Sequence, residues 1–226
     1  MDTRKNLRFS EGFFLLGLLL LGLGTAFMAK ADFGLSAIIA PSYVLAEIFG
    51  TAPGTMNYLF YTALLLLLCL IRRGARVEYL FVFLTALLFG WIVNGWTWAL
   101  RGVTVTTLPA RIPLYCVGLI LSSFSLALIF QSYFPPQAPE LFVKEISALA
   151  GWDMYRVKHA YDILSLILAI TLSLLCLGRL RHVGIGTVVN ALINGPTIGF
   201  FAHRLERRWR VTALFPKLER WFTEKR

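Results

Sequence analysis

The stretch FPPQAPELFVKEISALAGWDMYRVKHAYD, residues 134–162, separates two long apolar runs and decides how the fold is interpreted. Pro135, Pro136 and Pro139 prevent a continuous helix across its start, because proline lacks a backbone N–H and clashes with the preceding turn. Backbone that is broken at membrane depth has to be sheltered by protein or by a water-filled cavity. The stretch therefore predicts a re-entrant or interfacial helix.

The same stretch carries four ionisable side chains beside the apolar runs: Glu140, Lys158, His159 and Asp162. Such groups are costly within a bilayer and usually mark a paired or hydrated site. Lys158 and Asp162 are four residues apart and share one helix face, so they form either a structural ion pair or a pair that a ligand separates. Glu140 either complements the charge of a helix N-terminus or binds a cation or proton. His159 faces another direction and is either a packed side chain or a proton relay.

The composition places the chain in a lipid bilayer. Of the 226 residues, 58% are hydrophobic and 15% are charged, against about 25% charged residues in soluble domains. We expect one integral membrane domain over residues 1–204 and a basic, amphipathic cytoplasmic tail over 205–226, with a disordered tail as the alternative. The net charge of +10 is concentrated near the chain ends, which indicates contact with anionic lipid rather than nucleic acid.

Six apolar runs are long enough to cross a membrane, which takes about 20 residues each. They lie at residues 12–29, 56–71, 79–100, 113–131, 157–178 and 183–203. The interrupted segments 33–50 and 134–151 are predicted to be broken helices. With both termini cytoplasmic, most of the 22 Lys and Arg residues, including Arg72, Arg73 and Arg76 of one short loop, fall on the cytoplasmic side. The predicted fold class is an all-α polytopic membrane protein.

The two halves of the chain, 11–101 and 112–204, resemble each other. An offset of 101 residues pairs Asn57 with Lys158, and Tyr61 with Asp162. An offset of 105 residues aligns TALLFGWIVNG, which begins at Thr85, with NALINGPTIGF, which begins at Asn190. Because each half holds three spans, the halves are predicted to have opposite orientations. Inverted repeats with broken helices are a recurrent plan of secondary transporters.

Three motifs resemble one known family: GLGTAFMAKADFGLSA at 22–37, FPPQAPEL at 134–141 and GIGTVVNALINGPTIGFF at 184–201. They are similar to the YczE/YyaS/YitT-like bacterial integral membrane proteins, closest to the YczE branch. Members of that family tend to carry an aromatic-acidic pair after the position of Gly34. This chain has Ile38 and Ile39 there, and its matching acid is Glu140. The resemblance implies a multi-pass protein of the bacterial inner (cytoplasmic) membrane with a regulatory or transport role.

Three asparagines, Asn94, Asn190 and Asn194, lie within apolar spans. An amide in such a position usually links helices by hydrogen bonds and less often binds a substrate. Gly195 and Gly199 are four residues apart, which allows a neighbouring helix to approach closely.

The three cysteines, Cys69, Cys116 and Cys176, lie within apolar runs and form no C-x-x-C pair, so neither a disulfide nor a metal site is expected. The sequence carries no cofactor fingerprint and no catalytic arrangement. No catalytic, cofactor-binding or metal-binding residue is therefore assigned, and the protein is not expected to be an enzyme.

Two functional hypotheses follow. The first is a small secondary transporter or permease that binds an unknown small solute or ion, with Glu140, Lys158, Asp162, His159, Asn190 and Asn194 as the candidate binding residues. The second is a regulatory or scaffolding membrane protein that acts through a protein partner. The expected partners are the lipid bilayer and the solute. A homo-oligomer or another membrane protein is left open, and nucleic acid is not expected.

Overall fold

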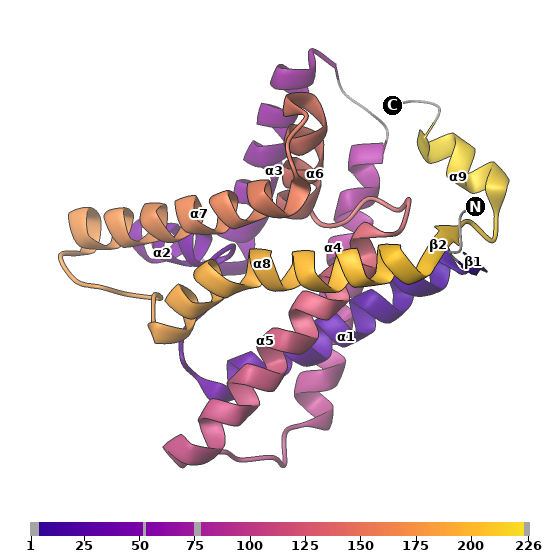
Figure 1. The fold of residues 1–226 in the computed structure, drawn as a ribbon. Helices are drawn as coiled ribbons and strands as arrows, with labels where there is room; N and C mark the ends of the chain where they lie inside the picture. Colours follow the sequence, from indigo (N-terminus) through magenta and orange to yellow (C-terminus); the bar gives the residue numbers. More distant parts are fainter. Residues whose placement is uncertain (1–4, 52, 75–77, 224–226) are drawn as a thin grey trace.

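The computed structural model describes residues 5–51, 53–74 and 78–223, and within them the chain is mostly helical (Figure 1). The helices are α1 (Ser10–Ala31), α2 (Ala40–Phe49), α3 (Pro53–Arg72), α4 (Glu78–Ala99), α5 (Leu108–Phe130), α6 (Ala138–Ala150), α7 (Met154–Leu177), α8 (Ile185–Arg208) and α9 (Pro216–Thr223). The two strands are β1 (Lys5–Arg8) and β2 (Trp209–Thr212). Arg76 and the last three residues of the predicted tail lie outside the described residues.

Six of the described helices, α1, α3, α4, α5, α7 and α8, are long and apolar enough to cross a membrane. The helices α2 and α6 have 10 and 13 residues. At about 1.5 Å per residue they are roughly 15 and 20 Å long, shorter than the ~30 Å hydrocarbon core. The predicted all-α polytopic fold is confirmed.

The ends of the helices differ from the sequence prediction by a few residues. The helix α5 begins at Leu108 instead of residue 113, because a proline in the first helical turn costs no backbone hydrogen bond. The helix α8 continues to Arg208 instead of ending near residue 203, since arginine favours a helix even outside the apolar span.

The helices α1–α4 and α5–α8 follow the same order of one long helix, one short helix and two long helices. Both short helices end at a left-handed glycine, Gly50 with φ 64° and Gly151 with φ 67°. Glycine adopts this conformation without steric cost, which makes it a common helix stop. Each short helix packs against both α3 and α7 (Figure 1).

The centre of the molecule is the crossing of α1 and α5, which is held close by glycines. A Cβ atom on Gly24 would lie 2.7 Å from the carbonyl oxygen of Gly118, and one on Gly118 would lie 2.8 Å from that of Gly24. A Cβ atom on Gly17 would lie 3.0 Å from the carbonyl oxygen of Ser125. With the offset of 101 residues, Gly17 corresponds to Gly118 and Gly24 corresponds to Ser125. The two close contacts are therefore equivalent in the two halves.

We expect Gly24→Ala to reduce the free energy of unfolding by about 1–3 kcal/mol, because an added methyl group would push the two helix backbones apart. Gly90→Ala is the matched control, since a Cβ atom there meets nothing within 4 Å and alanine favours a helix by about 1 kcal/mol over glycine. The measurement is unfolding in mixed micelles. Equal stability of Gly24→Ala and the wild type would contradict the close crossing.

The two short helices lie near opposite ends of α7. Near the end of α7, Glu47 of α2 contacts Arg181 Nε at 3.0 Å and His182 Nε2 at 2.7 Å, both in the link that follows that helix. Desolvation alone would raise the pKa of Glu47, but the hydrogen bonds from His182 and Arg181 outweigh it and lower the pKa. Near the start of α7, Glu145 of α6 forms an ion pair with Arg72, the last residue of α3. The helix α7 between them has 24 residues and is about 36 Å long.

Contacts that the sequence did not predict hold the two ends of the chain together. The strands β1 and β2 pair in parallel, with Leu7 opposite Val211. In the first turn of α1, Glu11 accepts hydrogen bonds from the backbone N–H groups of Leu214 and Phe215 at 2.9 and 3.0 Å. Phe222 of α9 is 2% exposed and packs against aromatic rings of the membrane domain. Strands of four residues are too short to show a periodic pattern in the sequence.

Candidate solute site

A cavity of about 290 Å³ lies between the two halves of the molecule. Its walls come from α1, the α1–α2 link, α2, α3, α4, α5, α8 and the start of α6. Much of the lining is apolar, and the polar part includes Ser36, Ser122, Gln137, Glu140, Asn190 and Asn194. The rings of Tyr43, Tyr61 and Phe89 also line it. A mainly apolar hollow with a few convergent polar groups is typical of small-molecule sites.

Glu140 is the charged group of this cavity. Its side chain lines the cavity while the residue as a whole is 6% exposed. The break before α6 places it in the first helical turn, where the helix dipole favours a negative charge. Over the described residues no side-chain donor hydrogen-bonds its carboxylate, and Lys158 is the cation that interacts with it electrostatically. The carboxylate is therefore free to meet a ligand in the cavity.

Lys158 and Asp162 form an ion pair behind the cavity wall, and both are 0% exposed. The second oxygen of Asp162 accepts a hydrogen bond from Asn194 Nδ2 at 3.3 Å. In turn, Asn194 Oδ1 accepts from Ser123 Oγ at 3.0 Å. This chain of contacts links α7, α8 and α5, and it extends to the cavity through Asn194. Lys158 and Asp162 could form a structural ion pair or a pair that a ligand separates. In the structure the ion pair is formed and is shielded from the cavity.

Asn190 holds the break between α1 and α2. Its Oδ1 accepts hydrogen bonds from the backbone N–H of Ala37 and from Ser36 Oγ, both at 3.3 Å. The break between α5 and α6 is held in a similar way, since Thr85 Oγ1 of α4 donates to the carbonyl oxygen of Pro135 at 3.0 Å. The offset of 105 residues pairs Thr85 with Asn190. Each break is thus fixed by the last long helix of the opposite half.

His159 and Asn94 do not belong to this site. A Cβ atom on Gly195 would lie 2.8 Å from the Cα of His159, so this histidine packs where α7 crosses α8. Its Nδ1 is buried and has no partner among the described residues. Asn94 is exposed on α4 and links no helices within the described chain. The prediction that Asn94 links helices is therefore wrong for this chain, because its face of α4 packs against no other helix.

Sequence reasoning missed several lining residues, among them Ser122, Gln137 and Tyr43. Single hydroxyl and amide groups among apolar residues carry no spacing signal. Tyr61 did carry a signal, because the repeat offset pairs it with Asp162. Both residues lie eight positions after the start of their helices, α3 and α7.

The charge balance decides what the site can hold. Glu140 and Asp162 share one ammonium group, that of Lys158. The three groups therefore carry one excess negative charge when both carboxylates are ionised, and none when Glu140 is protonated. The described residues contain no group of three His, Cys, Asp or Glu side chains that could hold a metal ion. One free carboxylate suits a proton or a monovalent cation.

The region matched in the comparison with protein families includes all or most of each of the six long apolar helices. A family model described as a family of unknown function, DUF6198, matches residues 9–203, from just before α1 to the late turns of α8. No curated protein and no solved structure matches the chain. Because the match covers most of the chain and every residue of the candidate site, the protein belongs to this family of unknown function, DUF6198.

Proposed function

We propose that the protein is a small secondary transporter that exchanges protons for a small monovalent cation at Glu140. The observation that carries the proposal is a buried carboxylate that faces a cavity without a direct cationic partner. A proton and a cationic solute would neutralise the same charge, so they would compete for it. Competition at one site is the simplest way to couple their movements in opposite directions.

The cavity favours an organic cation with an apolar body, such as a protonated amine. A volume of about 290 Å³ suits a small molecule. Tyr43, Tyr61 and Phe89 line the cavity, and aromatic side chains can stabilise a cation through their π systems, an interaction that strengthens where water is excluded. An inorganic ion would gain little from the apolar walls.

Alternating access would follow from an inverted relation between the two halves. The repeated helix order, the reciprocal glycine contacts of α1 and α5, and the matched bonds at the two breaks support that relation. In such transporters the site lies between the repeats, and one repeat rocks against the other. The resemblance to bacterial inner-membrane proteins with suggested transport roles agrees with this function.

The regulatory hypothesis receives less support. The features that favoured it were the basic tail and the packing glycines, but part of that tail is packed inward through Phe222 and is tied to Glu11 by backbone hydrogen bonds, and Gly24 and Gly118 pack within the chain.

The test is transport by the purified protein in liposomes. With an outwardly directed proton gradient, we expect uptake of a small monoamine from a panel of cations and a matching efflux of protons. Proton movement is followed with a pH-sensitive dye and amine uptake with a radiolabel. Liposomes that take up none of a panel of amines and monovalent inorganic cations would contradict the proposal.

A further inference from the structure

A second hollow lies outside the solute site, near the end of α8. This groove has a volume of about 520 Å³ and is lined almost entirely by apolar side chains. Leu16 of α1, Leu128 of α5, Phe201 of α8 and Trp209 of β2 are among its lining residues. Its volume falls within the range of ligand pockets, about 300–1,000 Å³.

A basic hollow adjoins the apolar groove. It has a volume of about 440 Å³ and is lined by Phe200, His203, Arg204, Arg207 and Arg208. Arg204 and Arg208 line both hollows, and they share one face of α8 because they are four residues apart. The two hollows therefore meet at a pair of arginines.

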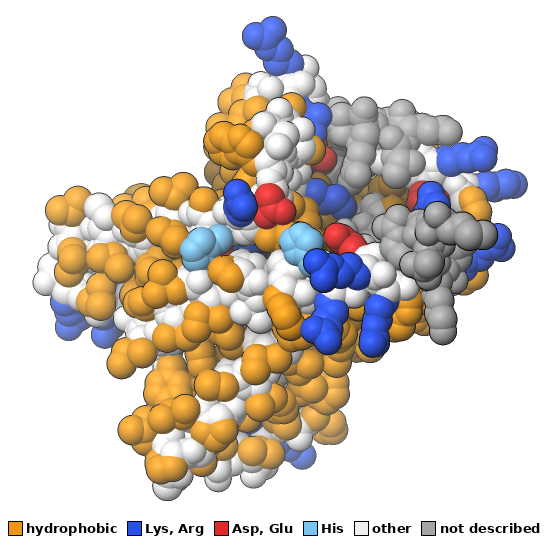
Figure 2. Space-filling model, viewed as in Figure 1, with side chains coloured by type: hydrophobic (Ala, Val, Ile, Leu, Met, Phe, Trp, Pro, Cys, Tyr) orange, Lys and Arg blue, Asp and Glu red, His pale blue; other side chains and the backbone are white. Residues whose placement is uncertain are grey.

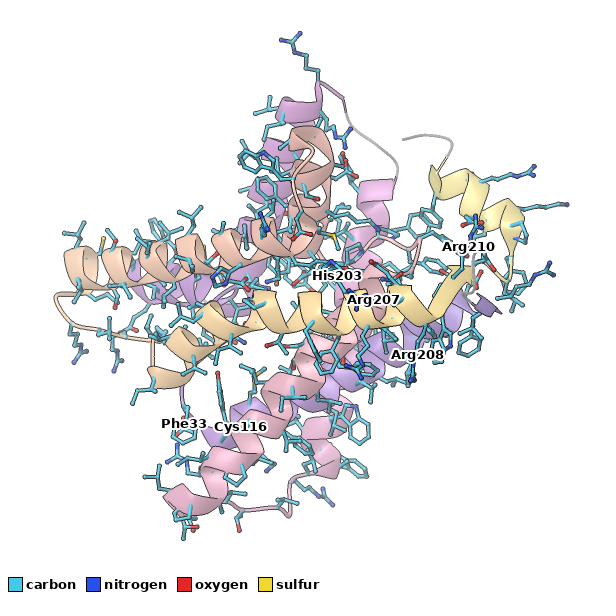
Figure 3. The ribbon with its side chains drawn as sticks, in the orientation of Figure 1. Phe33, Cys116, His203, Arg207, Arg208 and Arg210 are labelled. Carbon is cyan, nitrogen blue, oxygen red and sulfur yellow. The ribbon has the colours of Figure 1, made fainter. Side chains whose placement is uncertain are left out.

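These arginines have no acidic partner among the described residues. Arg204, Arg207, Arg208 and Arg210 are exposed, and the nearby Glu206 instead bonds Gln131 Nε2 at 2.9 Å. Figure 3 places His203, Arg207, Arg208 and Arg210 along the last turns of α8 and the start of β2. In Figure 2, Lys and Arg side chains gather beside a broad hydrophobic surface. Their charge is available to an external anion.

We propose that the two hollows together bind one anionic glycerophospholipid of the cytoplasmic leaflet. Its phosphate lies between Arg204 and Arg208, and one acyl chain lies in the apolar groove against Leu16 and Leu128. The arginine guanidinium group matches phosphate in geometry and charge. The positive-inside rule assigns this end of α8 to the cytoplasmic leaflet, where anionic lipids are concentrated. An anion without acyl chains would leave the groove unfilled, and a zwitterionic lipid would add a cationic group beside the arginines.

The test is native mass spectrometry of the full chain in detergent, with added phosphatidylglycerol, phosphatidylcholine or glycerol 3-phosphate. We expect one tightly bound phosphatidylglycerol. The double variant Arg204→Gln/Arg208→Gln should bind it about 25-fold more weakly, because each arginine near an anionic surface contributes about fivefold in affinity. Leu16→Trp, which fills the groove and keeps both arginines, should also weaken binding. Lys217→Gln/Arg220→Gln is the matched control, since it removes the same charge from α9 outside both hollows.

Three outcomes would overturn the proposal. Equal binding of phosphatidylcholine would mean that the arginines do not select the headgroup. Displacement of phosphatidylglycerol by glycerol 3-phosphate at similar concentration would mean that the groove contributes nothing. Equal weakening by the α9 control would mean that only total charge matters. The elution volume and helical content of each variant show whether it is folded, independently of any transport assay.

Discussion

Glu140→Gln should reduce proton-coupled amine uptake to the level of empty liposomes while leaving the protein folded. Glutamine keeps the size and the hydrogen-bonding oxygen of the side chain, but it carries no charge and takes up no proton at neutral pH. Amine uptake and proton efflux would therefore be lost together. Stability should stay equal or rise, because the substitution removes a buried charge that lacks a direct partner.

Asp32→Asn is the matched control for this loss of a carboxylate. The Asp32 side chain is 86% exposed, and Asp32 is not one of the residues that line the cavity. Its backbone has a φ of 52°, a conformation that asparagine also tolerates. We expect its uptake to match the wild type. Proton-coupled uptake that survives in Glu140→Gln would contradict the role assigned to Glu140.

Lys158→Met should destabilise the protein by about 3–5 kcal/mol, the usual cost of leaving one partner of a buried ion pair alone. It removes the positive charge from Asp162, which is 0% exposed, and from the nearby Glu140. Arg156→Met is the control on the same helix. Its side chain is exposed, so a change within about 0.5 kcal/mol is expected.

The double variant Lys158→Met/Asp162→Asn should recover most of that stability. It removes both buried charges, and a neutral replacement of a buried ion pair is often tolerated without loss. The measurement is the free energy of unfolding in mixed micelles for Lys158→Met, for Asp162→Asn and for the double variant. A double variant as unstable as the sum of the singles would show that Lys158 and Asp162 do not act as a pair.

Much of the fold could be predicted from sequence because a bilayer imposes strong rules. Apolar runs of about 20 residues identify the spans, and the prolines at 135, 136 and 139 identify the break before α6. Lys158 and Asp162 stood out because charge is rare in such runs, and helical spacing predicted their contact. Glu140 stood out for the same reason, and the structure places it on the cavity.

Other parts of the site depend on distances between segments that are remote in sequence. Asn190 gained its role from a bond to Ala37, 153 residues away. Ser122 of α5 and Tyr43 of α2 line the same cavity only because the fold brings these two helices around one space. The sequence left His159 as either a packed side chain or a proton relay, and only the fold shows that its helix face packs against Gly195. The four-residue strands and the backbone hydrogen bonds to Glu11 leave no periodic signal in the sequence.

The central claim is that water and solute reach the cavity beside Glu140. Ser122 is suited to test this, because it lines the cavity and its buried hydroxyl has no partner among the described residues. Cys69, Cys116 and Cys176 would first be replaced by alanine, and Ser122→Cys added. Ser173→Cys serves as the control, since Ser173 is also buried and lies on α7, outside the cavity lining.

The measurement is the rate at which a small cationic methanethiosulfonate modifies each cysteine in sealed vesicles of both orientations. The account predicts that Ser122→Cys reacts from at least one side, that a transported amine slows the reaction, and that Ser173→Cys stays unmodified. A Ser122→Cys that is as inert as Ser173→Cys from both sides would contradict a solute site between the two halves.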